Sequence, residues 1–288
     1  MAATSIGSTV SRRQLGRHLR ALRERAKLRT TEVAKAMDWS QPTLSRIETG
    51  HVPMRPIDVE RICEIYSADK ETTAGLVALA KEARTPDWWQ IYDEAVPTWL
   101  ELLLGLEQVA SRFLWYEGHL MPGIFQTPRY ALELMRDQAA SMAEMRVKLR
   151  MERQALLTRG PNPPQYHVLL DEGVLHRPMA GPEAMVEQLH KLVEVSGLSN
   201  VALQVLPYSA GCHDGLLAGP FVVMDFPQDD VAVSEPTTVF LEGLHNAIYL
   251  DKPQTVAGYV DAFNILRRTA LDKDASRELI TRVARSLQ

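Results

Sequence analysis

The side chains best suited to recognition chemistry lie on one short predicted helix, residues 40–49. Its apolar Leu44 and Ile47 would face a core and turn the intervening side chains outward. Ser40 is a good N-cap, and a capped helix N-terminus suits phosphate oxygens. Glutamine and arginine can form paired hydrogen bonds with adenine and guanine edges in the major groove of duplex DNA. The outward positions hold Gln41, Thr43, Ser45 and Arg46.

The elements around this helix are predicted to position it. A second helix beginning at Thr30 would cross it at Ala34, where a small side chain permits close approach. Asp38 tolerates a left-handed turn between the two helices, and Gly50 is well placed to end the later one. Further amphipathic segments bring the total to five short helices. We therefore expect an all-α helix-turn-helix domain over residues 11–84, after a disordered leader at 1–10, which ends where the apolar periodicity of the first helix starts.

Charge is distributed unevenly along the 288 residues. Residues 1–50 carry ten Lys or Arg against four acids, a net charge of +6, which leaves −10 for the rest of a chain whose formal net charge is −4. Such asymmetry is typical of a protein in which only one end meets a polyanion.

Residues 30–50, TTEVAKAMDWSQPTLSRIETG, resemble the Xre/Cro/repressor-type helix-turn-helix. The resemblance implies binding to a double-stranded DNA operator, and Asp38 departs from it where glycine is usual. It also implies an ion pair between Arg23 and Glu48 that holds the first helix to the third. The resemblance implies that Gln41, Pro42 and Arg46 face bases, and the outward position of Thr43 adds it to this set. The residues expected at phosphates are Arg12, Arg13, Thr30, Ser40, Ser45 and Arg55.

After a junction at residues 85–97, the pattern changes to that of a larger α+β domain with a small mixed sheet over 98–288. A strand, a helix and a strand in succession predict a βαβ crossover with a parallel strand pair. The predicted helices are 98–117, 128–137, 141–159, 182–196 and 253–270. The predicted strands are 166–170, 201–207, 221–226 and 238–243.

Several ordered motifs in this second half carry a resemblance of their own: Trp88-Trp89, Pro122–Ala131, Arg150–Gln154, Asp171–Leu175 and Gly211–His213. Together they resemble the C-terminal domain of actinobacterial Xre regulators described as Scr-type toxin–antitoxin antitoxin-like proteins. That family implies a partner, a small protein encoded by a neighbouring gene. Related regulators act in the development and antibiotic production of filamentous actinomycetes.

Other polar residues of the second half have two interpretations. One interpretation is an acid–base or metal cluster formed by Glu117, Glu172, His176, His213 and Asp214. No spacing typical of metal or nucleophile sites supports it, and an ordinary loop is favoured for His213 and Asp214. The chain is therefore expected to be no enzyme and to hold no cofactor or metal. The possible partner or ligand region comprises Trp88, Trp89, Gln126, Arg129 and His213, with packing at a domain hinge favoured for the tryptophans.

The remaining features concern location and assembly. The longest stretch without charged residues, Val195 to His213, is rich in polar residues, glycine and proline, so no membrane span is expected, and Cys63 and Cys212 suit a reducing cytoplasm. Helix-turn-helix proteins meet half-sites about 34 Å apart as dimers, so a homodimer is expected. A second hypothesis keeps DNA binding but makes the acidic domain a small-molecule sensor, and a third, less favoured, makes it an enzyme.

Overall fold

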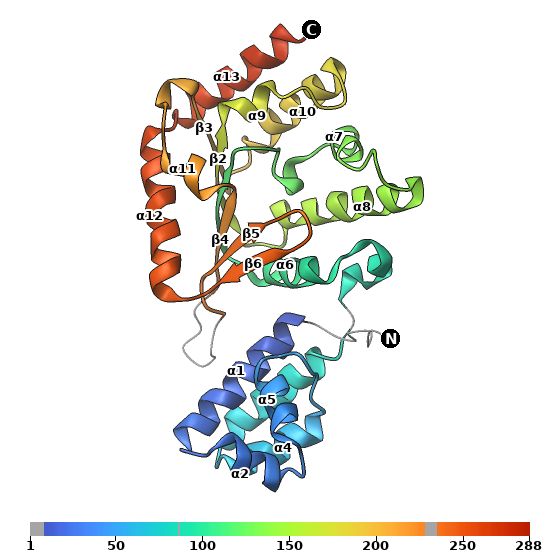
Figure 1. Ribbon diagram of the computed structural model, residues 1–288, viewed down its shortest axis with the longest axis vertical. Coiled ribbons are helices and arrows are strands. Elements are labelled where there is room, and N and C mark those ends of the chain that lie inside the picture. Colours follow the sequence, from blue (N-terminus) through green and yellow to red (C-terminus); the bar gives the residue numbers. More distant parts are fainter. Residues whose placement is uncertain (1–8, 86, 228–234) are drawn as a thin grey trace. The chain divides into compact units, whose positions relative to one another are not determined.

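The computed structural model describes residues 9–85, 87–227 and 235–288. Its internal contacts divide the chain into two compact units (Figure 1). The first unit holds the N-terminal part of the chain up to Ile91, and the second holds most of the remainder. No helix among the described residues is both long and apolar enough to span a membrane.

The first unit is all-α, which confirms the predicted class. Its helices surround one apolar core, in which Leu19, Val33, Leu44, Val59 and Ile62 are fully buried. The predicted leader falls mainly on residues 1–8, which lie outside the described residues. The helices are α1 (Thr9–Arg25), α2 (Thr30–Ala36), α3 (Gln41–Glu48), α4 (Pro56–Ile65) and α5 (Lys70–Glu82). The 3-10 segment η1 (Trp88–Ala95) follows them.

The second unit is built on a mixed sheet of six strands in the order β3-β2-β1-β4-β5-β6. The strands β1, β2 and β3 are parallel. Antiparallel pairing then joins β4 to β1, β5 to β4 and β6 to β5. Helix α10 connects the parallel strands β2 and β3, which confirms the predicted crossover. The strands are β1 (Arg112–Glu117), β2 (Gln165–Asp171), β3 (Val201–Leu206), β4 (Phe221–Asp225), β5 (Thr238–Glu242) and β6 (Ala247–Leu250).

Helices cover both faces of this sheet (Figure 1). On one face, α12 contributes Phe263 and Leu266 to a core shared with Leu114 and Val223. On the other, η2 brings Phe125 against the sheet. The helices are α6 (Thr98–Val109), α7 (Pro128–Glu133), α8 (Ala140–Arg153), α9 (Glu172–His176), α10 (Pro182–Val195), α11 (Asp214–Ala218), α12 (Pro253–Thr269) and α13 (Lys273–Ser286). The short 3-10 segments are η2 (Gly123–Phe125), η3 (Gln154–Thr158) and η4 (Tyr208–Ala210).

The main departure from the sequence prediction is at residues 98–117, where a single helix was expected. The helix α6 ends at Val109, and Arg112–Glu117 forms the strand β1 in the interior of the sheet. This strand is buried on both faces and is rich in aromatic residues, which favour strands. Its uninterrupted apolar run cannot be distinguished from a buried helix by periodicity.

Candidate nucleic-acid interface

The turn between α2 and α3 is set by two residues. Asp38 adopts the left-handed conformation with φ of 57°, as its residue type allowed. Ser40 caps α3, since its Oγ accepts a hydrogen bond from the Thr43 amide at 3.2 Å. The N-cap of α2 is Arg29 rather than Thr30, and its amide donates to Glu32 Oε2 at 2.8 Å. Both helices therefore begin with satisfied backbone donors and a defined direction.

The C-terminal end of α3 is equally well defined. Gly50 has a φ of 75°, and its amide donates to the carbonyl oxygen of Ile47 at 2.9 Å. A Cβ at Gly50 would lie 2.7 Å from the Arg13 Cα. A Cβ at Gly16 of α1 would lie 2.5 Å from the Ile47 carbonyl oxygen. Only glycine at these two positions lets α1 approach the end of α3 this closely.

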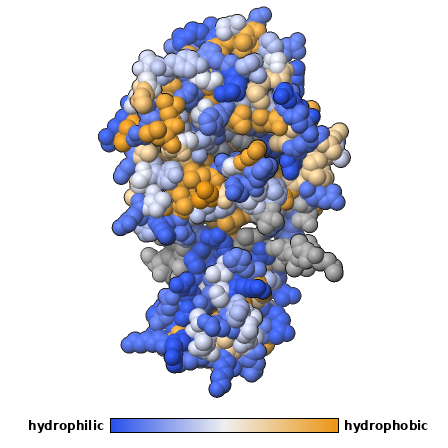
Figure 2. Space-filling model, in the orientation of Figure 1, coloured by the Kyte–Doolittle hydropathy of each residue, from blue (hydrophilic) through white to orange (hydrophobic). Residues whose placement is uncertain are grey.

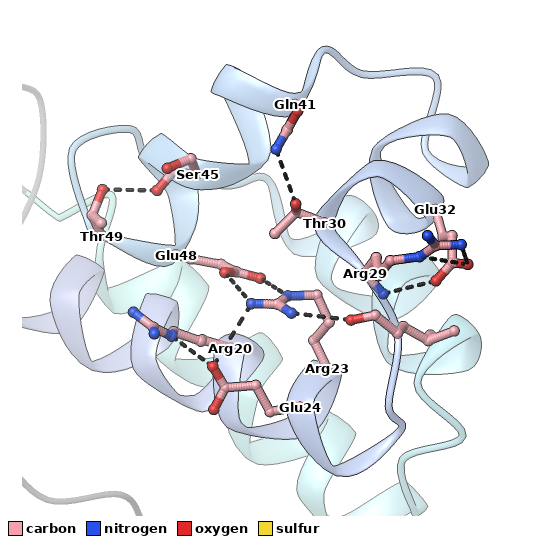
Figure 3. A network of polar contacts seen from close by, with 11 residues as sticks. Arg20, Arg23, Glu24, Arg29, Thr30, Glu32, Gln41, Ser45, Glu48 and Thr49 are labelled. Atoms are coloured by element: carbon pink, nitrogen blue, oxygen red, sulfur yellow. Dashed lines mark hydrogen bonds and ion pairs between the residues drawn. The ribbon is translucent and has the colours of Figure 1, made fainter.

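An ion pair attaches α3 to α1 (Figure 3). Arg23 Nε donates to Glu48 Oε1 at 2.6 Å and Arg23 Nη2 donates to Glu48 Oε2 at 2.9 Å, and Nη1 reaches the Leu28 carbonyl at 3.0 Å. The two side chains are only 11 % and 6 % exposed. The hydrogen bond with Glu48 raises the pKa of Arg23. This is the pair that the resemblance implies, and it fixes α3 with planar, two-bond geometry.

The outward face of α3 carries the residues expected at bases. Gln41, Pro42 and Arg46 are exposed, and Thr43 is half-buried. Gln41 Nε2 donates to Thr30 Oγ1 at 3.2 Å, so these two side chains join the beginnings of α3 and α2 (Figure 3). Among the described residues the Arg46 guanidinium has no hydrogen-bond or ion-pair partner, which leaves all its donors free for a ligand.

The phosphate candidates are placed less uniformly. Ser40 and Ser45 are exposed at α3, whereas Arg55 is exposed but occupied by Asp58, with Nε 2.7 Å from Oδ2. Arg13 is half-buried beside Gly50. Arg12 is only 6 % exposed.

The burial of Arg12 bears directly on its expected role. Burial lowers its pKa, and Asp87 and Glu101 oppose that effect. All three residues belong to the first unit. Because the guanidinium lies inside the unit beside acidic groups, its position gives no support to a phosphate contact.

Free positive charge remains around the candidate interface. Arg20 pairs with Glu24 at 2.9 Å and Arg29 with Glu32 at 3.0 Å, so part of the N-terminal charge is compensated locally. Exposed cations with no ion pair in the described part of the chain are Arg25, Lys27, Lys35 and Arg46. Such a surface favours a polyanion and predicts salt-dependent binding.

The possible partner or ligand residues are distributed over both units. Trp88 and Trp89 belong to the first unit and pack edge to face, with ring centroids 5.7 Å apart. Gln126 is buried, and its Nε2 donates to the Met121 carbonyl at 2.8 Å. Arg129 is exposed at the start of α7, with Nη2 3.6 Å from a carboxylate oxygen of Glu183.

His213 lies apart from these residues, at the edge where the parallel strands end. Its Nε2 is 3.5 Å from Asp171 Oδ2, and its ring meets Tyr116 edge to face at 6.2 Å. Burial raises the pKa of nearby Glu117 to about 7. Among the described residues, no group of three or more His, Cys, Asp and Glu side chains is arranged to hold a metal ion.

Sequence reasoning missed four positioning residues, three of them near the interface and one in the second unit. Arg29 and Glu32 close the start of α2, and the glutamate three residues after the cap is the recognisable signal. Gly16 gives no local signal, because a Cβ at this position would clash with the end of α3, which is distant in sequence. Asp171 was missed as the partner of His213, since they are distant in sequence.

Comparison with known families matches two segments of the chain. A helix-turn-helix domain matches residues 14–76, which contain α2 and α3. A domain of unknown function (DUF5753) matches residues 100–282, more than half of the chain. No curated protein and no solved structure matches.

Proposed function

Because the chain belongs to the family that shares the domain of unknown function DUF5753 and carries a helix-turn-helix domain before it, we propose that it is a sequence-specific transcriptional regulator. The helix-turn-helix domain supports DNA binding as such. The finer statement, that α3 reads bases in the major groove, is carried by one observation. The exposed Arg46 has no partner among the described residues, on a helix fixed to α1 by Arg23 and Glu48.

The proposal assigns different tasks to neighbouring residues. Gln41 and Arg46 provide the donors and acceptors that distinguish adenine and guanine edges, and Pro42 and Thr43 complete the base-facing surface. The exposed hydroxyls of Ser40 and Ser45 contribute contacts to phosphate. The proposal includes a motif of the Xre type, and in helix-turn-helix proteins the second helix of the motif lies in the major groove.

The experiment is selection of random duplexes by the full-length protein, followed by titration of the selected sequence. Arg46→Ala is expected to weaken binding about 5- to 150-fold, the equivalent of about 1–3 kcal/mol, and to relax preference at one base position. Arg268→Ala, at an exposed position of α12, is the matched control and should leave affinity unchanged. Uniform weakening by Arg46→Ala on all duplexes would contradict base reading.

We further propose a homodimer that meets two half-sites in the cytoplasm. Helix-turn-helix dimers place their recognition helices about 34 Å apart, or a multiple of that spacing, so a palindromic selected sequence would support this assembly. A selected sequence without internal symmetry, together with a monomer in sedimentation, would contradict it.

For the second unit we propose a regulatory rather than enzymatic role, in the manner of the actinobacterial Scr-type antitoxin-like regulators. A small protein encoded by a neighbouring gene would bind this unit. Its exposed apolar side chains include Leu217, which is 86 % exposed, and Leu244, which is 90 % exposed. Figure 2 shows hydrophobic areas on one face of this unit. Such residues are suited to a protein partner. Failure of every adjacent small gene product to co-purify with the full chain would contradict the partner.

A further inference from the structure

Three arginines share one side of α8. Arg146, Arg150 and Arg153 are spaced four and three residues apart, which places them on one face of a helix. Arg153 has a complete partner, since its Nε and Nη2 donate to the two carboxylate oxygens of Glu107 at 2.9 and 2.6 Å. Arg153 therefore has both its charge and two of its hydrogen-bond donors compensated by Glu107.

The other two arginines lack this compensation. The Nε atoms of Arg146 and Arg150 are both buried without a hydrogen-bond partner. Neither guanidinium has an ion pair within the described residues. Burial, together with Arg153, lowers the pKa of Arg150 to about 10. Both side chains are half-buried, and a buried donor without an acceptor is unfavourable, so these two Nε atoms call for an oxygen acceptor, which an anion can supply.

The surrounding charges do not supply that anion. Glu107 is occupied by Arg153, and Glu242 of β5 is the carboxylate whose field opposes the lowered pKa of Arg150. Glu242 is exposed and makes no ion pair with either arginine. With three arginines facing two carboxylates, the cluster carries an excess positive charge on the side of α8 that holds Arg146 and Arg150.

We propose that Arg146 and Arg150 bind the carboxylate or phosphate group of a small organic anion. Planar guanidinium groups bind both oxyanions through paired hydrogen bonds. A small molecule is favoured over an acidic side chain of a protein because Arg150 is half-buried and its Nε atom lies inside its own unit. The site gives this regulator an input distinct from the protein partner proposed above, and it does not depend on that partner.

The test is titration of the full-length protein with sodium phosphate and, separately, with sodium citrate, each against sodium chloride at equal ionic strength. Calorimetry gives the affinity, and the thermal midpoint gives an independent reading. We expect saturable binding of at least one oxyanion and a rise in the midpoint that chloride does not produce. The two titrations also distinguish phosphate from carboxylate recognition.

Arg150→Gln is expected to reduce the oxyanion affinity at least tenfold. Lys148→Gln, on the same helix but exposed, is the matched control and should retain the wild-type affinity. Without anion, Arg150→Gln should unfold at the same or a higher temperature than the wild type, because it removes a buried charge that has no partner. Arg146→Gln is the second variant and should also lose oxyanion affinity. It provides the test if Arg150→Gln does not fold.

Three results would overturn the proposal. The first is no oxyanion binding beyond that of chloride, and the second is equal affinity in Arg150→Gln and the wild type. The third is a marked fall in the thermal midpoint of anion-free Arg150→Gln, since that would show a partner within the protein. Arg150-dependent binding of an acidic peptide, with no binding of either small anion, would reassign the site to a protein partner.

Discussion

The attachment of α3 to α1 can be tested by removing one member of the Arg23–Glu48 pair. Glu48→Leu leaves the Arg23 guanidinium, whose side chain is 11 % exposed, with the Leu28 carbonyl at 3.0 Å and the more distant Glu24 Oε1 at 3.9 Å. Breaking a buried pair in this way costs about 3–5 kcal/mol. The remaining bond and the residual exposure place the expected loss at the lower end, about 3 kcal/mol. In a unit of this size such a loss lowers the melting temperature by about 12–24 °C.

The assay is urea-induced unfolding of the full-length protein, followed by far-ultraviolet circular dichroism. Arg23→Met should cost a similar amount, because it leaves Glu48 buried and unpaired. The double variant should lose less than the sum of the two single changes, since apolar replacement of both members removes the uncompensated charge. This difference measures the coupling between the two side chains.

Arg20→Met is the matched control for this cycle. Arg20 and Glu24 also form an ion pair at 2.9 Å, but their side chains are 59 % and 56 % exposed. Removing it should cost less than about 1 kcal/mol. If Glu48→Leu costs no more than Arg20→Met, the inference that the Arg23–Glu48 pair fixes α3 is refuted.

Two further changes test the capping of α3 and the burial of Glu117. Ser40→Ala should lower the free energy of unfolding by about 1 kcal/mol, because it removes the N-cap hydrogen bond to the Thr43 amide. Ser45→Ala, at an exposed position of the same helix, is the control and should leave it unchanged. Equal losses for the two variants in denaturant titrations would contradict the capping role of Ser40. Glu117 keeps its proton in the folded state up to a pKa of about 7, whereas its ordinary pKa is 4.5, so its contribution to stability falls as the pH rises between these values. Glu117→Gln should therefore gain about 2.5 kcal/mol relative to the wild type between pH 5 and pH 8 in urea unfolding. A pH-independent difference would refute the raised pKa.

The helix-turn-helix could be predicted from local signals. Caps, turns and apolar spacing are set by neighbouring residues, so Asp38, Ser40 and Gly50 indicated their roles without knowledge of the fold. The expected α+β class of the second unit is confirmed as well. Its parallel pair was predictable because the segment between β2 and β3 contains a long amphipathic helix, α10.

Features that depend on distant residues were beyond local reasoning. β1 reads as part of a helix because what makes it a strand is its pairing with β2 and β4, which are distant in sequence. The segment of α8 with Arg146 and Arg150 reads as a charged surface helix, and nothing in its own sequence shows that their Nε atoms are buried. The acidic surroundings of Arg12 likewise come from Asp87 and Glu101, which are distant from it in sequence.

The order of strands in the sheet has a consequence for how the protein is made. Arg112 of β1 pairs with Gln165 on one side and Asp225 on the other, so β1 cannot complete its pairing until most of the chain has been synthesised. The five helices of the first unit, in contrast, end at Glu82, so their contacts with one another span a shorter stretch of chain than the pairing of β1 with β4. Domains rich in local contacts fold faster, and N-terminal domains fold first during synthesis. We therefore expect the nascent protein to acquire its helix-turn-helix before its sheet, and a ribosome-bound chain to bind DNA before its regulatory unit exists.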